Sequence, residues 1–466
     1  MLKKQRQTEC CTSPPLTDLC SSVFMLKYGE LPCCFDFFNR EKPMRNILRV
    51  LSFVLSLILL AFALIGCNET DAPQTQTQQE PNSLLTINGV DLNDYTIVYQ
   101  KTAISGGEKA FSYLNEKLVA LYGTELKGSS ISEDRYEILI GLDGNDEAIS
   151  KAYAENPSGL IGATGKKIVL MGANYSALCR VIDAFLDKAT GEEESREILI
   201  SGYELLDLDK ASLNVMTYNI LGDMNKSGRP SDARIRMVKT ILNNDVDVLG
   251  TQEDGSEHSK YFIENLKSYD IYRGDIEAGD YIYWKKNKFN VLGEGYYFLS
   301  DTPEQRSKYS DSNQYRTMTY VILKEKQTGK QFLFVNTHLD YRSSEETRVK
   351  QIDVLAALIK RVNKDNLPLV LLGDFNTTIS EIGSAVFHFL SENPSINMTS
   401  TVAEEKGDKG PTLIEGKFTL RHPYVFDYIF VTPDLVYTKY YTVVNNIFNG
   451  KYPSDHLPVL AQIEIY

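Results

Sequence analysis

The chain has 466 residues, of which 42% are hydrophobic, so it is long enough to build more than one sizeable core. Its formal net charge at pH 7 is −13. Residues 1–66 hold eight of the 49 Lys and Arg and five of the 62 Asp and Glu, so the rest of the chain carries a net charge of −16. Such an acidic surface repels polyanions at long range, which argues against avid non-specific binding of DNA, although a bound metal can reverse the field at one site.

The start of the chain is typical of an export signal. An uncharged apolar run from Val50 to Ile65 follows Arg45 and Arg49. The run is short for a membrane-spanning helix of about 20 residues and suits a signal peptide. It ends in the sequence LIGC, which resembles the bacterial lipobox, in which the cysteine is lipidated and becomes the mature N-terminus. The resemblance implies lipidation of Cys67, with an uncleaved signal anchor as the alternative.

Three segments follow from this interpretation. Residues 44–66 form the lipoprotein signal peptide, and residues 1–43, which fit no export signal, are a misassigned extension of a chain whose translation starts at Met44. Residues 67–83 are polar and contain two prolines, so we expect a lipid-anchored flexible linker. The protein is then expected in the bacterial cell envelope, outside the cytoplasm, attached to the membrane through its N-terminal lipid.

Residues 84–206 predict a small α+β domain. Apolar runs at 97–101, 136–142 and 166–173 indicate strands, and two amphipathic segments indicate helices. The segments LYGTEL, EILIGL and GKKIVLMGANYSALCRVIDAFL resemble the accessory domain that precedes the barrel of hexosaminidase- and glucuronidase-type glycosidases. That domain is usually non-catalytic, so we expect a spacer or packing partner here.

Residues 211–466 alternate predicted strands with predicted helices, which favours an α/β domain. Helices are expected at 231–244 and 347–362, where apolar residues recur at helical spacing. Strands are expected where apolar runs occur, at 213–220, 246–251, 281–284, 289–300, 315–324, 331–338, 367–375 and 457–465.

Polar residues follow several of these apolar runs. They are Asn219, Glu253, His338, Asp374, Asn376, Asp427, Asp455 and His456. Functional groups collect where strands end, because a rigid sheet holds them while the loops leave room for substrate. Carboxylate and carboxamide oxygens are the ligands that Mg²⁺ prefers, and histidines exchange protons near neutral pH. The pattern therefore indicates a metal-assisted site at strand ends.

The motifs TYNI, QE, NTHLD, GDFN and SDHLP occur in this order between Leu213 and Tyr466. Together they resemble the endonuclease/exonuclease/phosphatase superfamily, which includes deoxyribonuclease I, neutral sphingomyelinases and inositol polyphosphate phosphatases. The resemblance implies a deoxyribonuclease I-like α/β fold: a four-layered, two-sheet β-sandwich flanked by helices, with the site at one edge of the sandwich.

The resemblance also implies roles for the metal and proton-handling residues. Asn219 and Glu253 hold Mg²⁺, for which Mn²⁺ can substitute, and Asp455 completes or approaches the metal shell. His456 accepts a proton from the attacking water or orients that water. Asp427 fixes the tautomer of His456, and a carboxylate inside an apolar strand would be costly without such a partner.

Three further residues are expected to contact the phosphate or the attacking water. Asp374 and Asn376 bind the water and a phosphate oxygen, and Asp374 is the rival general base. Which of Asp374 and His456 removes the proton stays open at this point. Arg316, in QYRTMTY, is expected to donate its guanidinium to the phosphate.

His338 is expected to donate a hydrogen bond to a non-bridging or leaving oxygen of the substrate. Deoxyribonuclease-like members pair the corresponding histidine with a glutamate. In this chain that region has Glu277 and Asp280 as candidates, so the general-acid role of His338 depends on which of them, if either, reaches it.

The sequence therefore predicts a monomeric, membrane-tethered, Mg²⁺-dependent hydrolase of phosphate esters, either a phosphodiesterase, a nuclease or a phosphatase. Its substrate is a nucleic acid, a phospholipid head group, or a sugar or inositol phosphate. The glycosidase-like accessory domain favours glycan-linked phosphate. The alternative is a catalytically silent member of the superfamily that only binds a ligand at the surface.

Overall fold

The computed structural model describes most of the chain from Leu85 to Tyr466. The expected extension, signal peptide, Cys67 anchor and linker lie outside the described residues. Among the residues that it does describe, no helix is both long enough and apolar enough to cross a membrane. The gaps in the description are residues 101–105, 156–157, 193–194, 223–224, 379–398, 401–409 and 416.

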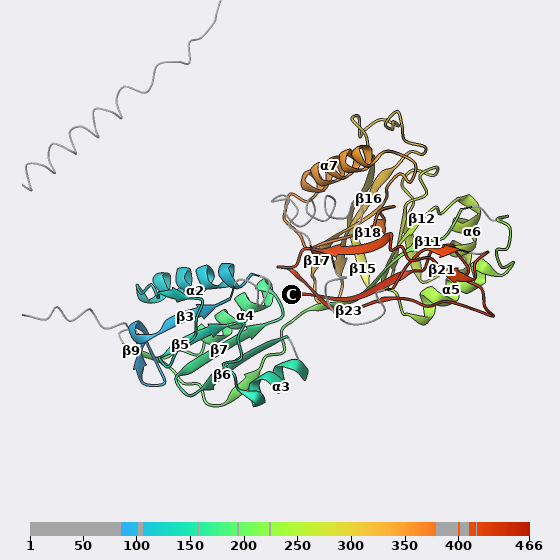
Figure 1. Cartoon of the computed structure of the whole chain (residues 1–466). Coiled ribbons are helices and arrows are strands. Elements are labelled where there is room, and N and C mark those ends of the chain that lie inside the picture. Colours follow the sequence, from blue (N-terminus) through green and yellow to red (C-terminus); the bar gives the residue numbers. More distant parts are fainter. Residues whose placement is uncertain are drawn as a thin grey trace, which may run out of the picture. The chain divides into compact units, whose positions relative to one another are not determined.

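The N-terminal part is a separate small α+β domain, as predicted (Figure 1). Its main sheet has six strands in the order β10 (Tyr203–Leu205), β6 (Gly159–Thr164), β7 (Lys167–Gly172), β5 (Glu137–Ile140), β3 (Thr96–Tyr99) and β4 (Gly128–Ser129). A second sheet has the order β2 (Val90–Asp91), β1 (Leu85–Ile87), β9 (Ser195–Ile198) and β8 (Thr190–Glu192), and a short 3-10 helix, η1, spans Leu92–Asp94. The three strands predicted from the sequence are therefore β3, β5 and β7.

Helices cover both faces of this main sheet (Figure 1). The predicted helices are α2 (Gly107–Tyr122) and α4 (Tyr175–Leu186), and their apolar side chains share one buried cluster with Ile97 and Ile138. On the other face lies α3 (Glu147–Glu155), which the sequence analysis did not predict. This helix is short and buries only two residues, so its periodicity in the sequence is weak.

The C-terminal part contains two six-stranded sheets. The first has the order β13 (Tyr269–Tyr272), β14 (Tyr281–Lys285), β12 (Val248–Gln252), β11 (Ala211–Asn219), β24 (Val459–Ile465) and β23 (Val436–Val443). The second has the order β15 (Phe289–Phe298), β16 (Thr317–Glu325), β17 (Gln331–His338), β18 (Leu369–Asp374), β22 (Asp427–Val431) and β19 (Thr399–Ser400). A two-stranded sheet pairs β20 (Ile414–Glu415) with β21 (Leu420–Arg421).

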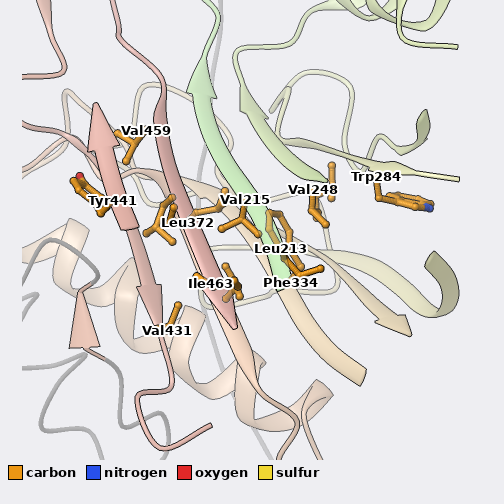
Figure 2. Close-up of a cluster of buried hydrophobic side chains, with 14 of the residues drawn as sticks. Leu213, Val215, Val248, Trp284, Phe334, Leu372, Val431, Tyr441, Val459 and Ile463 are labelled. Carbon is orange, nitrogen blue, oxygen red and sulfur yellow. The ribbon is translucent and has the colours of Figure 1, made fainter. Parts of the chain in front are cut away.

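The two large sheets stack through alternate side chains of their strands. In β11, Val215 joins the cluster between the sheets, whereas its neighbour Met216 faces the helices on the outside. In β17, Phe334 and Leu333 divide in the same way. This follows from the two-residue period of a strand. Figure 2 shows the inner cluster, in which Leu213 and Val215 come from one sheet and Phe334 and Leu372 from the other.

Helices form the two outer layers, so the sandwich has four layers as predicted (Figure 1). The first sheet packs against α5 (Ala233–Asn243) and α6 (Ser256–Asn265). The second packs against α7 (Glu345–Val362), and Ser344 caps its N-terminus by accepting a hydrogen bond from Thr347 N. The expected helices are confirmed as α5 and α7, whereas α6, β13 and β23 were not predicted.

Candidate active site

One row of polar side chains lies across the ends of three adjacent strands. His338, the last residue of β17, is opposite Asp374, the last residue of β18, and Asp374 is opposite Asp427, the first residue of β22. Gly373 makes this close pairing possible, because a Cβ at that position would lie 1.9 Å from the carbonyl oxygen of Thr337. Strand register thus brings together three residues that are far apart in the sequence.

The other sheet contributes Asn219 at the end of β11, opposite Gln252 at the end of β12. Glu253 follows directly. Gln252 ties the two sheets together, because its Nε2 donates to Asn336 Oδ1 of β17 at 2.6 Å. Asn336 Nδ2 in turn donates to the carbonyl oxygen of Thr251 at 2.7 Å. Both side-chain amides are fully buried. Their hydrogen bonds therefore hold the two sheets together at the edge where the site lies.

Three residues at this edge have a left-handed backbone conformation, which residues other than glycine rarely adopt. The φ angles are +55° for Leu221, +56° for Glu253 and +46° for Asn376. Such conformations cost roughly 1–3 kcal/mol each and persist where surrounding bonds enforce them. Here Leu221 N donates to Asn219 Oδ1 at 3.1 Å, and Asn376 N donates to Asp374 Oδ1 at 2.9 Å. Strain gathered on three neighbouring loops indicates a functional edge.

His456 is held between two buried carboxylates. Its Nδ1 donates to Asp427 Oδ2 at 2.8 Å, and its Nε2 lies 3.6 Å from Asp374 Oδ2. Burial alone would lower the pKa of His456, but the two carboxylates outweigh it and raise that pKa well above its usual value. Burial also raises the pKa of Asp374, with Asp427 adding to the effect and His456 opposing it, to about 7. The predicted pairing of His456 with Asp427 is present.

The predicted metal ligands share one side of the site. Asn219 Nδ2 donates to Asp374 Oδ2 at 3.0 Å and to Glu253 Oε1 at 3.3 Å, and Glu253 Oε2 accepts from Gly222 N at 3.2 Å. The amide nitrogen of Asn219 therefore faces the carboxylates. For Asn219 to act as a ligand, its amide must turn so that Oδ1 takes that place.

Asp455 is the third predicted ligand, and its side chain is 25% exposed. Lys226 Nζ lies 3.7 Å from Asp455 Oδ2. Ser454, its neighbour, donates to the carbonyl oxygen of Asn219 at 2.8 Å, which ties the loop of Asp455 to the loop of Asn219. With Glu253, these residues offer carboxylate and carboxamide oxygens, a donor set that suits a hard cation such as Mg²⁺.

A different trio also has the spacing of a metal site. Ligand atoms of Asp374, Asp427 and His456 lie within 4.8 Å of one another. We interpret this trio as a proton-handling group, because His456 Nδ1 is already bonded to Asp427 and because Mg²⁺ prefers oxygen to nitrogen. Glu253 and Asp455 line the same cavity and are bonded to no histidine, so we keep them as the metal ligands.

His338 does not have the partner that the sequence suggested. Its Nδ1 has no hydrogen-bond partner, so neither Glu277 nor Asp280 bonds to it. Glu277 instead pairs with Arg306. The Nε2 atom of His338 lies 2.9 Å from Asn376 Nδ2 and accepts its hydrogen. Burial lowers the pKa of His338 well below its usual value, so the ring is neutral, with Nε2 as its acceptor and its one proton on Nδ1.

Arg316 is buried, and a carboxylate that sequence reasoning missed lies beside it. Arg316 Nε lies 3.7 Å from Asp340 Oδ2. Asp340 Oδ2 also accepts from Gln314 N at 2.8 Å, and its Oδ1 accepts from Ser343 N at 2.9 Å. Asp340 is the last residue of NTHLD, so the motif contained the signal, but only the histidine was interpreted. This residue lies beside the guanidinium and connects the loop before β16 to the turn after β17.

A cavity of about 620 Å³ joins these groups. Most of the predicted residues line it, namely Glu253, Arg316, His338, Asp374, Asn376, Asp455 and His456, whereas Asn219 and Asp427 lie buried behind them. Lining residues that the sequence analysis did not single out include Lys226, Ile276, Gln314, Tyr341, Leu413 and Phe426. The cavity holds acidic, basic and apolar surface together, and its size suits a phosphate with an attached ring.

Asp280 gives a prediction about stability and pH. It is fully buried, its Oδ1 has no hydrogen-bond partner, and its Oδ2 accepts from Thr317 Oγ1 at 2.8 Å. Burial raises the pKa of Asp280 from 3.8 to about 8. Its contribution to stability is therefore complete below pH ~4, the unfolded pKa, and is lost as the pH rises through the folded pKa.

We expect Asp280→Asn to raise the melting temperature at pH 9, because the uncharged amide removes the cost of a buried carboxylate. The rise should be at least ~2–4 °C, the shift that about 1 kcal/mol produces in a domain of this size. At pH 5 the variant should melt within error of the parent protein or below it. Thermal unfolding of both proteins in EDTA across this range measures the difference. The exposed Asp365→Asn serves as control, and a pH-independent difference for Asp280→Asn would contradict the assignment.

Comparisons with known proteins agree with this geometry. The sequence model of the Endonuclease/Exonuclease/phosphatase family matches residues 216–456. A search of curated proteins finds no significant match. The chain is similar to a family protein of known structure from Bacteroides vulgatus, with 26% identity over 55% of this chain and 100% of that chain and a TM-score of 0.50.

Two structures from Bacteroides thetaiotaomicron are also similar. One is a protein of the same family, with 25% identity over 56% of this chain and 100% of that chain and a TM-score of 0.48. The other is described as a mannosyl-6-phosphatase, with 26% identity over 54% of this chain and 99% of that chain and a TM-score of 0.47. The family model matches the C-terminal part, in which the site lies.

Proposed function

We propose that this chain, which belongs to the endonuclease/exonuclease/phosphatase family, is a Mg²⁺-dependent hydrolase of phosphate esters that acts outside the cytoplasm. Proteins of this family hydrolyse phosphate esters and generally use a divalent metal. The observation that carries the proposal is the placement of His456 between Asp427 and Asp374, in a cavity that Glu253 and Asp455 also line. Hydrolysis needs proton transfer and charge neutralisation at one place, and this cavity offers both.

The metal would be held by Glu253 and Asp455, together with the turned amide of Asn219. When bound, it neutralises charge on the phosphoryl oxygens and polarises the phosphorus for attack. Arg316 adds a positive charge in a defined position, because its guanidinium is buried beside Asp340 and is not free to move into solvent. Lys226, which is half-exposed above Asp455, can turn towards a phosphate oxygen.

The proton of the attacking water passes to the trio of Asp374, Asp427 and His456. Asp374 Oδ2 and His456 Nε2 lie 3.6 Å apart, so one water can contact both atoms. Asp427 holds Nδ1–H of the imidazole and so keeps Nε2 directed towards Asp374. We assign proton transfer to these groups as a unit, because a proton added to one changes the charge that the other two experience.

One activity panel tests the proposal. The protein is assayed with bis-p-nitrophenyl phosphate, p-nitrophenyl phosphate, plasmid DNA, sphingomyelin and inositol phosphates, each with Mg²⁺ and with EDTA. We expect hydrolysis of at least one ester with Mg²⁺ and its loss in EDTA. Turnover that is unchanged in EDTA would contradict the metal dependence. A folded protein that hydrolyses none of these esters would instead support the silent, ligand-binding alternative.

We also propose that the chain is tethered to the bacterial cell envelope through a lipid on Cys67. The sequence LIGC after a short, uncharged apolar run supports this proposal. A single lipid chain gives only marginal membrane binding, and stable attachment requires more than one. An anchored enzyme with a polar linker at 67–83 could act on substrates near the membrane surface.

Cys67→Ser should abolish lipidation and leave the precursor uncleaved or the protein free of the membrane. The reason is that the lipid is attached through a thiol, which serine lacks. Expression in a bacterial host, followed by membrane fractionation and intact mass, measures both effects. Cys179→Ser is the matched control, because it removes a thiol inside the first folded domain. If Cys67→Ser leaves both the mass and the membrane fraction unchanged, the anchor proposal is wrong.

A further inference from the structure

We propose that one wall of the catalytic cavity is a subsite for a hexose, so that the substrate is a sugar phosphate. This inference rests on the proposed function and goes beyond it by naming the group that carries the phosphate. The wall consists of Ile276 and Glu277 from the loop between β13 and β14, Gln314 from the loop before β16, and Tyr341 from the loop after β17. None of these residues has a part in the proton transfer described above.

The four side chains offer the chemistry that recognises a polyhydroxylated ring. Tyr341 is 50% exposed and Ile276 is 61% exposed, yet both line the cavity. A half-exposed aromatic ring at a cavity gives a flat apolar surface for the C–H face of a sugar. The carboxylate of Glu277 accepts hydrogen bonds, and the amide of Gln314 both donates and accepts, as hydroxyl groups require.

Two of these residues are positioned by one buried carboxylate. Asp340 accepts a hydrogen bond from Gln314 N on one oxygen and from Arg342 N and Ser343 N on the other, at 2.8, 3.0 and 2.9 Å. It therefore fixes both the backbone of Gln314 and the turn that carries Tyr341. Arg316, the proposed phosphate ligand, lies beside the same carboxylate. The spacing between phosphate and ring contacts is thus set before substrate binds.

The loop with Ile276 and Glu277 is also braced. Asp275 Oδ1 accepts from Glu277 N at 3.1 Å and from Ala278 N at 3.0 Å. Gly279 lies against the loop that carries Glu253, and with a φ of +71° a Cβ there would come within 2.9 Å of Asp254 N. The wall is therefore packed directly behind the proposed metal ligand, so a ring bound to it lies near the scissile phosphate.

A third contact joins this loop to the loop before β16. Arg306 pairs with Glu277 and lies over the ring of Tyr315, with 4.3 Å between the guanidinium carbon and the ring centroid. Tyr315 directly follows Gln314. Arg306 binds Glu277 Oε2 and contacts Tyr315, so the two loops that supply Glu277 and Gln314 are connected.

The charge of the wall selects among the substrate classes. A polynucleotide places further phosphates next to the scissile one, and these would be repelled by Glu277 and by a chain with a net charge of −16 beyond residue 66. A phospholipid needs a larger apolar surface than Tyr341 and Ile276 provide. A neutral polyol has neither difficulty, and its hydroxyl groups match the carboxylate and the amide.

The test compares kcat/KM for hexose 6-phosphates, p-nitrophenyl phosphate and adenosine 5′-monophosphate in the full chain with Mg²⁺. We expect a hexose 6-phosphate to be the best of the three substrates. Gln314→Ala and Glu277→Gln should each lower the ratio of kcat/KM for hexose phosphate to that for aryl phosphate by about tenfold, the loss typical of one hydrogen bond to a sugar hydroxyl. Tyr341→Ala should lower kcat/KM for both, because either ring can stack.

The matched controls are two residues of the loop before β16, which also carries Gln314, and neither lines the cavity. Gln305→Ala removes an exposed amide, and Glu304→Gln removes a carboxylate that pairs with Arg361. Neither should change the ratio. If aryl phosphate is hydrolysed but hexose phosphates are no better, or if the ratio is unchanged in both Gln314→Ala and Glu277→Gln, the subsite is wrong and the hydrolase proposal stands. A preference for adenosine monophosphate would assign the wall to a nucleoside. No hydrolysis of any ester would remove the proposed function itself.

Discussion

Glu253→Ala should nearly abolish hydrolysis of every ester that the protein cleaves. We expect kcat/KM to fall by at least ~10²-fold, since removal of an outer-shell partner alone costs roughly 10–100-fold. Glu253 is one of two carboxylates that line the cavity on the metal side. Excess Mg²⁺ should restore only part of the activity, because the remaining oxygens complete the octahedron poorly.

Two controls separate this loss from misfolding. Glu253 accepts hydrogen bonds from Asn219 Nδ2 and Gly222 N, and alanine cannot accept them, so Glu253→Ala should be slightly less stable for reasons unrelated to metal. Glu253→Gln keeps the shape and removes only the charge, and it should lose Mg²⁺ affinity with little change in melting temperature. Glu257→Ala, on the first turn of α6, removes an exposed glutamate nearby and should behave as the parent. Full activity of Glu253→Gln at limiting Mg²⁺ would exclude Glu253 as a ligand.

The sequence predicted most of the site because its residues occur in motifs at the ends of apolar strands. Strand register explains why this works, since the last residues of β17 and β18 and the first residue of β22 are direct neighbours. A long apolar run ending in a polar residue is enough to place that residue at the edge of a sheet. The pairing of His456 with Asp427 was implied by the family resemblance, and the cost of an unpartnered carboxylate in an apolar strand agrees with it.

The contacts between loops could not be predicted in this way. The role of Asp340 depends on backbone N–H groups of two different loops, and backbone groups leave no trace in the sequence. The prediction of a carboxylate partner for His338 was wrong for a related reason. Glu277 and Asp280 are three residues apart, yet one pairs with Arg306 at the surface and the other is buried beside Thr317. Only the three-dimensional path of the loop determines which of the two carboxylates is exposed and which is buried.

Secondary structure was missed where the pattern is short or mixed. The strand β23 alternates buried and exposed residues with a bulge between Thr438 and Tyr440, so its two-residue period is interrupted. The helix α6 begins in the loop after Glu253 and has a polar sequence, in which the fully buried residues His258 and Phe262 form no long apolar face. The predicted elements were those with long apolar faces, which are also the elements that form the core.

His456→Ala should lower kcat by at least the ~10²–10⁴-fold that is typical of a lost acid–base group. The imidazole lies between Asp427 and Asp374, and alanine can neither accept nor donate a proton. Mg²⁺ affinity should change little, since His456 is not among the proposed ligands. Isothermal titration with Mg²⁺ and the kinetics of an aryl phosphate ester measure the two effects separately.

Asp427→Asn should also lower kcat, because an amide at this position can favour the wrong tautomer of His456. The negative charge of Asp427 raises the pKa of His456, so that pKa should fall when the carboxylate is replaced by an amide. NMR titration of the imidazole in the parent and in Asp427→Asn would show the shift directly.

The double variant Asp427→Asn/His456→Ala should be little worse than His456→Ala alone. If Asp427 acts only through the imidazole to which it is bonded at 2.8 Å, then nothing is left for it to orient once the ring is gone. Thr432→Ala, which removes a hydroxyl just beyond the other end of β22, is a control for general damage to that strand. Losses that multiply in the double variant would show that Asp427 and His456 act independently, and the assignment of the trio as one proton-handling unit would have to be abandoned.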